Sequence, residues 1–311
     1  MPLERRVLLV CLVSCAGCSA HVDRPRPPPP AAEELTFVRR TEGGAEHLYS
    51  IRPRSGSPRP LENTLRGSLQ DPDWTADGRR VAFRFLASGD YEDTRVQVMN
   101  ADGSNLADLS KRSGIRGSSP SWSPDASRIA FSGKRSGDAR ESIWVVDANG
   151  ANAKRLTDPG REAQYPAWSP DGRRIAFTFV VDGGFDVYLM NADGSAVRPL
   201  GRSPEAENWP VWSPDSRRVA YGVEAAAGSS VRVVNADGTK WTTVLGPRRR
   251  AGVPMAWSPG ARLAVNCAGR RDDDIGICTV DADGSRFRRV VDDGGFPAWR
   301  PTRRKRSAEP R

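Results

Sequence analysis

Residues 168–194 read Trp-Ser-Pro-Asp-Gly-Arg-Arg-Ile-Ala-Phe-Thr-Phe-Val-Val-Asp-Gly-Gly-Phe-Asp-Val-Tyr-Leu-Met-Asn-Ala-Asp-Gly, and this stretch decides the fold. Its Ser-Pro-Asp-Gly segment is a β-turn sequence, because proline pre-sets φ and glycine tolerates the closing position. Residues 175–179 alternate large and small side chains, which predicts a strand. Asp182-Gly183-Gly184 predicts a hairpin that leads to a returning strand at 187–190. The final Asn-Ala-Asp-Gly predicts a third turn.

Copies of this unit fill the chain, and each can be located by a tryptophan that follows a proline-containing segment. The tryptophans are spaced by 48, 46, 44, 45 and 42 residues. They are Trp74, Trp122, Trp168, Trp212, Trp257 and Trp299. A period in the mid-forties with several strands per repeat is typical of a β-propeller in which each repeat forms one four-stranded blade.

The two ends of the repeat region complement each other. Residues 35–61 contain the later strands of a repeat but no tryptophan segment, whereas residues 296–301 contain a tryptophan segment but no later strands. Pairing the two halves closes the ring and hides both sheet edges. We therefore predict an all-β fold, a six-bladed β-propeller over residues 35–301, closed by pairing N-terminal strands with the C-terminal strand.

The repeat resembles the β-propeller repeat of TolB and its relatives, a WD40-like propeller repeat family. The resemblance covers about residues 35–301 and rests on the pattern Trp-Ser-Pro-Asp-Gly, Ile-Ala-Phe and Asn-Ala-Asp-Gly-Ser. It implies the fold, and it implies function much less specifically. TolB also carries an α/β domain before its propeller, whereas the residues before Leu35 are too few to form one.

Residues 1–17 are predicted to be a lipoprotein signal peptide, because two arginines precede an apolar run that is too short to span a membrane. Cys18 is the expected lipidated residue, and Cys15 is the alternative. The competing interpretation is an ordinary secreted protein with unmodified cysteines. No aspartate follows either cysteine, which for Gram-negative lipoproteins implies the outer membrane, facing the periplasm. Secretion or cell-surface display is the alternative location.

Two further segments lie outside the repeats. Residues 18–34 contain a run of four prolines and are expected to be a semi-rigid spacer. Residues 302–311 form a basic tail that we expect to be disordered. Nucleic acid is not an expected partner of an exported protein, despite a net charge of +9. The membrane is expected to be contacted through the lipid anchor only, and the propeller is expected to be a monomer.

Five arginines occupy one repeat position, immediately before the second strand, and are therefore expected to form a ring on one rim. We expect them to pair with aspartates of the adjacent turns, a weak interaction at a surface. They are Arg80, Arg128, Arg174, Arg218 and Arg262.

The sequence contains few residues that could carry out catalysis. Only two histidines are present, His21 in the spacer and His47 in the closing blade, which leaves too little material for a Ser-His-Asp triad or a multi-histidine metal site. No Gly-x-Ser-x-Gly motif occurs. We therefore expect no catalytic residues, no metal and no cofactor, with a carbohydrate-active enzyme as the residual alternative. The repeated aspartates are interpreted as turn residues.

Binding is expected where the repeats differ. The residue before the proline of each tryptophan segment varies, and inner strands line the channel of a propeller, so these residues are expected at one channel mouth. They are Asp71, Ser119, Tyr165, Trp209, Val253 and Phe296. Three are aromatic, which suits a peptide or a glycan. The alternative is that they pack in the core between blades.

These observations support two hypotheses of function. The first is a non-catalytic envelope lipoprotein that binds a protein or peptide partner at the channel mouth. The second is a polysaccharide-binding or polysaccharide-processing propeller protein.

Cys267 and Cys278 lie in the fifth and most irregular repeat, on two strands of a hairpin centred on Asp272-Asp273. This centre places the cysteines directly opposite each other, about 4.5–5.5 Å apart at Cβ. Export supplies an oxidising compartment. We predict a disulfide, and two unpaired buried cysteines are the alternative.

Overall fold

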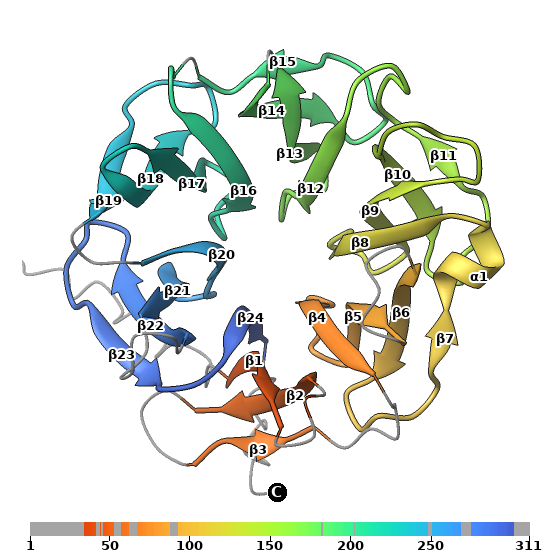
Figure 1. Cartoon of the computed structure of the whole chain (residues 1–311), viewed down its shortest axis with the longest axis horizontal. Helices are drawn as coiled ribbons and strands as arrows, with labels where there is room; N and C mark the ends of the chain where they lie inside the picture. The colour runs from red at the N-terminus through yellow and green to blue at the C-terminus, as the bar shows by residue number, and fades with distance from the viewer. Residues whose placement is uncertain are drawn as a thin grey trace, which may run out of the picture.

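The structure is a computed structural model that describes residues 34–301 apart from 42–43, 45, 53–56, 62–66, 88–92, 182, 202, 248–250 and 269–274. The described residues form six four-stranded antiparallel sheets around a central axis (Figure 1). This confirms the predicted six-bladed β-propeller. The predicted signal peptide, the basic tail and all but the last residue of the predicted spacer lie outside the described residues.

Five blades are continuous in sequence, and in each the first strand is innermost (Figure 1). Blade one comprises β4 (Ser68–Trp74), β5 (Arg80–Leu86), β6 (Thr94–Asn100) and β7 (Ala107–Asp108). Blade two comprises β8 (Arg116–Trp122), β9 (Arg128–Lys134), β10 (Ser142–Asp147) and β11 (Lys154–Arg155). Blade three comprises β12 (Ala163–Trp168), β13 (Arg174–Val181), β14 (Gly184–Asn191) and β15 (Arg198–Pro199).

The remaining blades follow the same plan. Blade four comprises β16 (Ala206–Trp212), β17 (Arg218–Ala225), β18 (Gly228–Asn235) and β19 (Thr242–Leu245). Blade five comprises β20 (Ala251–Trp257), β21 (Arg262–Ala268), β22 (Ile275–Asp281) and β23 (Arg288–Val291). A short helix, α1 (Leu109–Ser113), leads from blade one to blade two; the Asp108 carboxylate accepts the Lys111 N–H at its start.

Blade six joins the two ends of the propeller. Its inner strand is β24 (Gly295–Arg300), and its outer three are β1 (Glu34–Arg40), β2 (Glu46–Ile51) and β3 (Arg59–Pro60). Leu35 pairs with Trp299 across the junction, and Arg300 forms an ion pair with Glu34 at 3.3 Å. The closure predicted from the complementary sequence ends is therefore present.

The Ser-Pro-Asp turn is stabilised by hydrogen bonds that its own serine and aspartate side chains form. In blade three the Ser169 hydroxyl donates to the Asp171 carboxylate at 2.6 Å and accepts the Arg174 N–H at 2.9 Å. Gly172 closes the turn with φ of 74° and donates its N–H to the Ser169 carbonyl. The equivalent aspartate of blade two has its pKa lowered to about 2 by the same kind of hydrogen bonds. The repeated aspartates thus stabilise turns.

The core lies between blades, because each sheet packs against both neighbours. One apolar cluster combines Ile143 and Val145 of blade two with Trp168, Ile175 and Phe177 of blade three. Both faces of a blade are therefore covered, which explains the continuously apolar strands. No blade can bury its faces alone, so the ring is the stable unit.

The ring of arginines makes contacts that differ from the expected ones. Four of the five predicted arginines lie over the tryptophan of the next blade, with guanidinium-to-ring distances of 4.5–5.5 Å. Arg300 of blade six lies over Trp74 at 4.7 Å. Arg262 instead forms the expected pair with a turn aspartate, an ion pair at 3.3 Å with Asp281 of the Asp-Ala-Asp-Gly turn. Pairing with turn aspartates was therefore wrong as the main interaction, although Arg174 also approaches Asp171 at 3.8 Å; the flat guanidinium instead stacks on aromatic faces.

Candidate functional site

The inner strands carry a β-bulge where they line the channel. In blade three Gln164 pairs with Thr178 and Ala167 with Ala176, so two residues stand opposite one on the neighbouring strand. The first of the two, Tyr165, has φ of 54°. The same left-handed conformation, with φ of 49–54°, occurs at Asp71, Ser119, Trp209 and Phe296. Bulky residues rarely adopt it, so the fold holds these side chains in a strained, defined direction.

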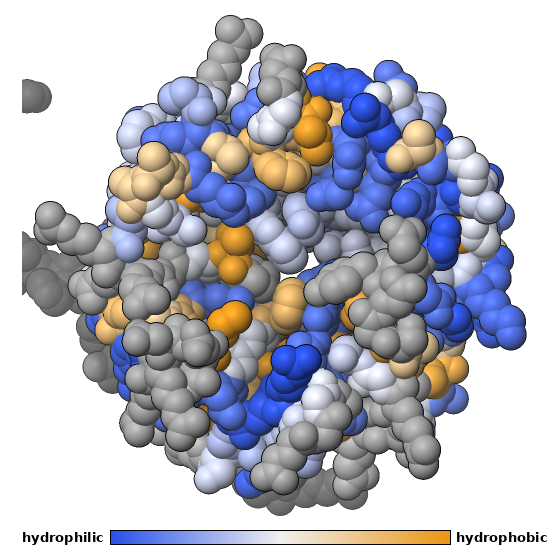
Figure 2. Space-filling view, in the orientation of Figure 1, coloured by the Kyte–Doolittle hydropathy of each residue, from blue (hydrophilic) through white to orange (hydrophobic). Residues whose placement is uncertain are grey.

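These five residues, all predicted binding residues, border one cavity on the propeller axis. The cavity has a volume of about 240 Å³ and receives residues from all six inner strands. It extends from the bulges towards the ring of tryptophans, reaching Trp168, Trp212, Trp257 and Trp299. Seen along the axis from the face shown in Figure 2, the centre of the ring is a narrow opening bordered by both hydrophobic and hydrophilic side chains. We call the cavity the channel mouth.

The aromatic part of the channel mouth is a stacked pair. The rings of Tyr165 and Trp209, from blades three and four, lie 4.0 Å apart between centroids with an interplanar angle of 21°. Burial, with the nearby charges of Asp71 and Glu141, raises the pKa of Tyr165 to about 12. The phenol therefore stays neutral at physiological pH, and the pair presents a rigid amphipathic surface.

The carboxylate of Asp71 also borders the channel mouth. Its Oδ2 accepts the Ser119 backbone N–H at 3.3 Å and the Ser119 hydroxyl at 3.2 Å. Its Oδ1 is buried and has no hydrogen-bond partner. Burial raises the pKa of Asp71, and the charge of Arg84 opposes this rise only in part.

Asp73 is a second carboxylate of the channel mouth, and the sequence reasoning missed it. It accepts the backbone N–H of Trp122, in the next blade, at 2.7 Å. Burial raises its pKa to about 7 against the hydrogen bonds from the Trp122 and Trp74 backbones. A signal was available: other repeats carry Ser121, an alanine or a valine at this position.

Val253, the sixth predicted binding residue, does not border the channel mouth. Blade five has an extra residue between its proline and tryptophan, so its bulge is different and Met255 and Ala256 line the cavity instead. Val253 packs against the core between blades four and five, where a Cβ on Gly222 would lie 2.3 Å from its Cγ1. A β-branched residue is also poorly suited to the left-handed conformation.

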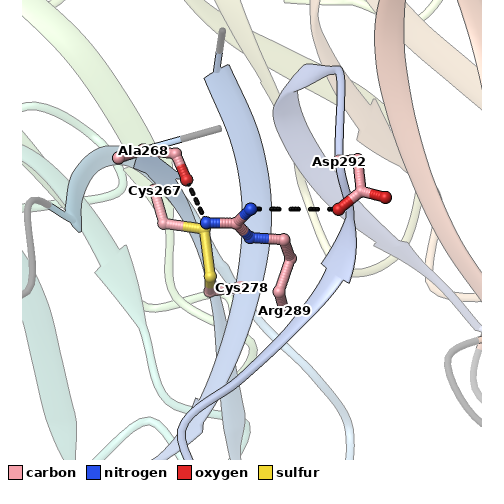
Figure 3. Close-up of a disulfide and its surroundings, with 5 residues drawn as sticks. All are labelled: Cys267, Ala268, Cys278, Arg289 and Asp292. Atoms are coloured by element: carbon pink, nitrogen blue, oxygen red, sulfur yellow. Dashed lines mark hydrogen bonds and ion pairs between the residues drawn. A yellow bond between two sulfur atoms is a disulfide. The ribbon is translucent and has the colours of Figure 1, made fainter. Parts of the chain in front are cut away.

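A disulfide joins Cys267 of β21 and Cys278 of β22, the pair that the sequence predicts. The cysteines are not directly opposite, because Cys267 pairs with Gly276 and Cys278 with Val265. The bridge therefore runs diagonally across the two strands, with a Cα–Cα distance of 5.8 Å, and the expected register was wrong. Figure 3 shows Arg289 beside the bridge, donating to the Ala268 carbonyl at 2.5 Å.

The remaining sequence predictions concern lipidation, metal binding and contact with the membrane. Cys15 and Cys18 lie outside the described residues. Among the residues described, no group of three or more His, Cys, Asp or Glu side chains is placed to hold a metal ion. Within the same residues, no helix is long and apolar enough to cross a membrane.

The propeller that contains the channel mouth is similar to proteins of known structure and family. The family model of the TolB β-propeller domain matches residues 29–261, about three quarters of the chain. TolB from Acinetobacter baumannii is similar in structure, with a TM-score of 0.74, 18% identity, and coverage of 88% of this chain and 68% of that one. Putative TolB from Agrobacterium tumefaciens has a TM-score of 0.66, 17% identity, and coverage of 86% and 91%.

A similar fold also occurs in an enzyme. Oligogalacturonate lyase from Vibrio parahaemolyticus has a TM-score of 0.57, 12% identity, and coverage of 83% of this chain and 79% of that one. At such identities the likeness concerns the fold alone. No curated protein sequence gives a significant match.

Proposed function

Because this chain belongs to the TolB β-propeller family, we propose that it is a non-catalytic protein of the cell envelope whose channel mouth binds a segment of a protein partner. One observation carries the proposal. Five of the six side chains that vary between repeats converge on one cavity, and a stacked tyrosine and tryptophan form part of its wall. The bulges occur in most repeats and are therefore a property of the fold. The side chains at the bulges differ from blade to blade, as expected of residues that bind a ligand.

The size and location of the cavity favour a segment of a partner. A volume of about 240 Å³ accommodates a few side chains, not a folded domain. An extended segment that enters from one face can place such side chains in the cavity while its backbone contacts the rim. Rigid aromatic residues provide contact area at low cost in conformational entropy.

Substitution of the aromatic pair tests the binding site. The variant Tyr165→Ala/Trp209→Ala is compared with Trp241→Ala, which removes a tryptophan that is 60% exposed outside the channel mouth. Each protein is used to capture partners from envelope extract and is applied to a glycan array, and circular dichroism monitors folding. We expect loss of the captured partner in the double variant and retention in Trp241→Ala.

Other outcomes of this experiment point elsewhere. Equal capture by the double variant and the wild type would exclude the channel mouth as the binding site. Binding to glycans that the double variant loses, with no protein partner, would support the polysaccharide-binding alternative, since sugar rings also stack on aromatic side chains. A double variant that no longer folds would assign both residues to the core.

The location in the cell is part of the proposal. We propose export by the predicted leader and lipidation at Cys18, with Cys15 as the alternative, and anchoring in the outer membrane facing the periplasm. Labelling with a radioactive fatty acid tests this in Cys18→Ser and Cys15→Ser. Only one of these variants is expected to lose the label. An unlabelled wild-type protein recovered from the medium would instead indicate secretion.

A further inference from the structure

The channel mouth contains a carboxylate, that of Asp73, whose charge the fold does not require. Asp73 accepts the N–H of Trp122 at 2.7 Å. At the equivalent position of blade two, Ser121 accepts the N–H of Trp168 at 2.9 Å through a neutral hydroxyl. The same contact between blades is therefore made without a charge, and a serine hydroxyl at position 73 would suffice to accept the Trp122 N–H.

The carboxylate of Asp73 also lacks a cationic partner. In the part of the chain that the structure describes, no basic side chain forms an ion pair with it, and burial raises its pKa. A buried carboxylate without a cation is costly. Asp71, two residues earlier on β4, adds an Oδ1 that is buried without a hydrogen-bond partner. Two carboxylates on one strand thus border the cavity: Asp71, whose charge Arg84 offsets in part, and Asp73, which accepts only backbone N–H groups.

Three aromatic residues of the channel mouth, Tyr165, Trp209 and Phe296, differ from its tryptophans on the inner strands in their contacts with cations. Arginines of this propeller stack on the inner-strand tryptophans Trp74, Trp122, Trp168, Trp212 and Trp257. In the part of the chain that the structure describes, the rings of Tyr165, Trp209 and Phe296 have no arginine or lysine over them. The Tyr165–Trp209 stack covers one face of each of these two rings, and no cation of the described residues covers the other.

We propose that the partner segment inserts a lysine side chain into the channel mouth, where Asp73 and Asp71 accept hydrogen bonds from the ammonium group and the Tyr165–Trp209 pair packs against its methylene stem. The inference rests on the proposed function, because it names the chemistry of the ligand for that same site. A compact ammonium has three donors and suits a narrow cavity with separate acceptors. The net charge of +9 does not prevent this binding, since exposed charges are screened beyond about 8 Å at physiological ionic strength.

Three phage-displayed libraries of nine-residue peptides test the inference. Their central residue is fixed as Lys, Gln or Glu, and the other eight positions are random. Selection on the wild-type protein is expected to enrich the Lys library strongly over the other two. Synthetic peptides from that selection are then titrated against the wild type, Asp73→Ser, Tyr165→Ala/Trp209→Ala and Trp241→Ala.

Asp73→Ser is the decisive variant, because it keeps a hydroxyl acceptor for the Trp122 N–H and removes the carboxylate. We expect it to bind the Lys peptides at least about tenfold more weakly than the wild type, while Trp241→Ala binds them normally. Enrichment of Gln or Glu peptides to the same degree, or unchanged affinity in Asp73→Ser, would overturn the inference and leave peptide binding intact. Failure of every library to give peptides that depend on Tyr165 and Trp209 would overturn the proposed function as well.

Discussion

The guanidinium carbon of Arg80 lies 4.5 Å from the ring centroid of Trp122, which belongs to the next blade. The same guanidinium donates a hydrogen bond to the Ala126 carbonyl at 2.8 Å, also in the next blade. One side chain thus connects two blades by stacking and by a hydrogen bond. Because the stacking recurs at five of the six junctions between blades, it connects most blades to their successors at a fixed radius.

Replacing Arg80 with Gln should lower the free energy of unfolding by about 1–2 kcal/mol, because one cation–π contact and one hydrogen bond between blades are lost. Urea denaturation followed by tryptophan fluorescence measures the change. Arg79→Gln is the matched control, since that neighbouring side chain is 67% exposed and only approaches Asp77 at 3.7 Å. Its effect should be within about 0.5 kcal/mol of zero. Equal losses in both variants would show that Arg80 contributes only surface charge.

Asp73 should make the propeller less stable as pH rises. Its pKa is raised from an ordinary value of 3.8 to about 7 in the folded protein. Between these two values the folded state holds a proton that the unfolded state has released, so the free energy of unfolding falls with increasing pH. Asp73→Ser should therefore exceed the wild type by roughly 1–3 kcal/mol at pH 8 and match it near pH 4.

The control for this pH dependence is Ser121→Ala. This substitution removes the equivalent hydrogen bond to Trp168 without changing a charge, so its loss of about 1 kcal/mol should be independent of pH. Thermal melts at pH 4 and pH 8 supply the comparison. A constant difference between Asp73→Ser and the wild type at both pH values would argue against a raised pKa at Asp73.

Position 222 should accept only glycine, because Val253 of the next blade packs against it. A Cβ at this position would lie 2.3 Å from Val253 Cγ1 and 2.9 Å from Asn208 Oδ1. Gly222→Ala should therefore destabilise the protein by roughly 1–3 kcal/mol. Adding Val253→Ala should restore part of this stability, which a double-mutant cycle measures as coupling. Gly252→Ala is the control, since its nearest atom would be Ser229 Cβ at an ordinary 3.5 Å.

The disulfide should protect Cys267 and Cys278 from alkylation when the protein is denatured without reduction. Peptide mapping identifies the modified positions separately from the other cysteines. Substituting both residues by alanine should cost somewhat less than about 3 kcal/mol, because the enclosed loop is short, and reductant should then have no further effect on stability. Alkylated Cys267 and Cys278 in the unreduced protein would contradict the bridge.

Much of the fold was predictable because the repeat encodes it locally. The Ser169 and Asp171 pair, Gly172 at positive φ and the alternation of residues 175–179 each specify a turn or strand from neighbouring residues. Repetition then multiplies this local signal, and the complementary ends specify the closure. The positions that vary before each proline could also be found, because equivalent positions of a repeat occupy equivalent places in the ring.

The sequence by itself thus determined the six blades, their closure, the pairing of Cys267 with Cys278 and the residues from which a channel mouth is drawn. Only the tertiary structure decided which of those residues reach the cavity, that Asp73 joins them and that Val253 does not, and that Arg80 stacks on Trp122 instead of pairing within its own turn. The physical reason is that the stacking of Arg80 and the lining of the cavity depend on contacts between blades about 45 residues apart in sequence, whereas the extra residue of blade five shifts Val253. A local pattern specifies a strand and its turns, whereas burial and side-chain direction are set by the neighbour against which that strand packs.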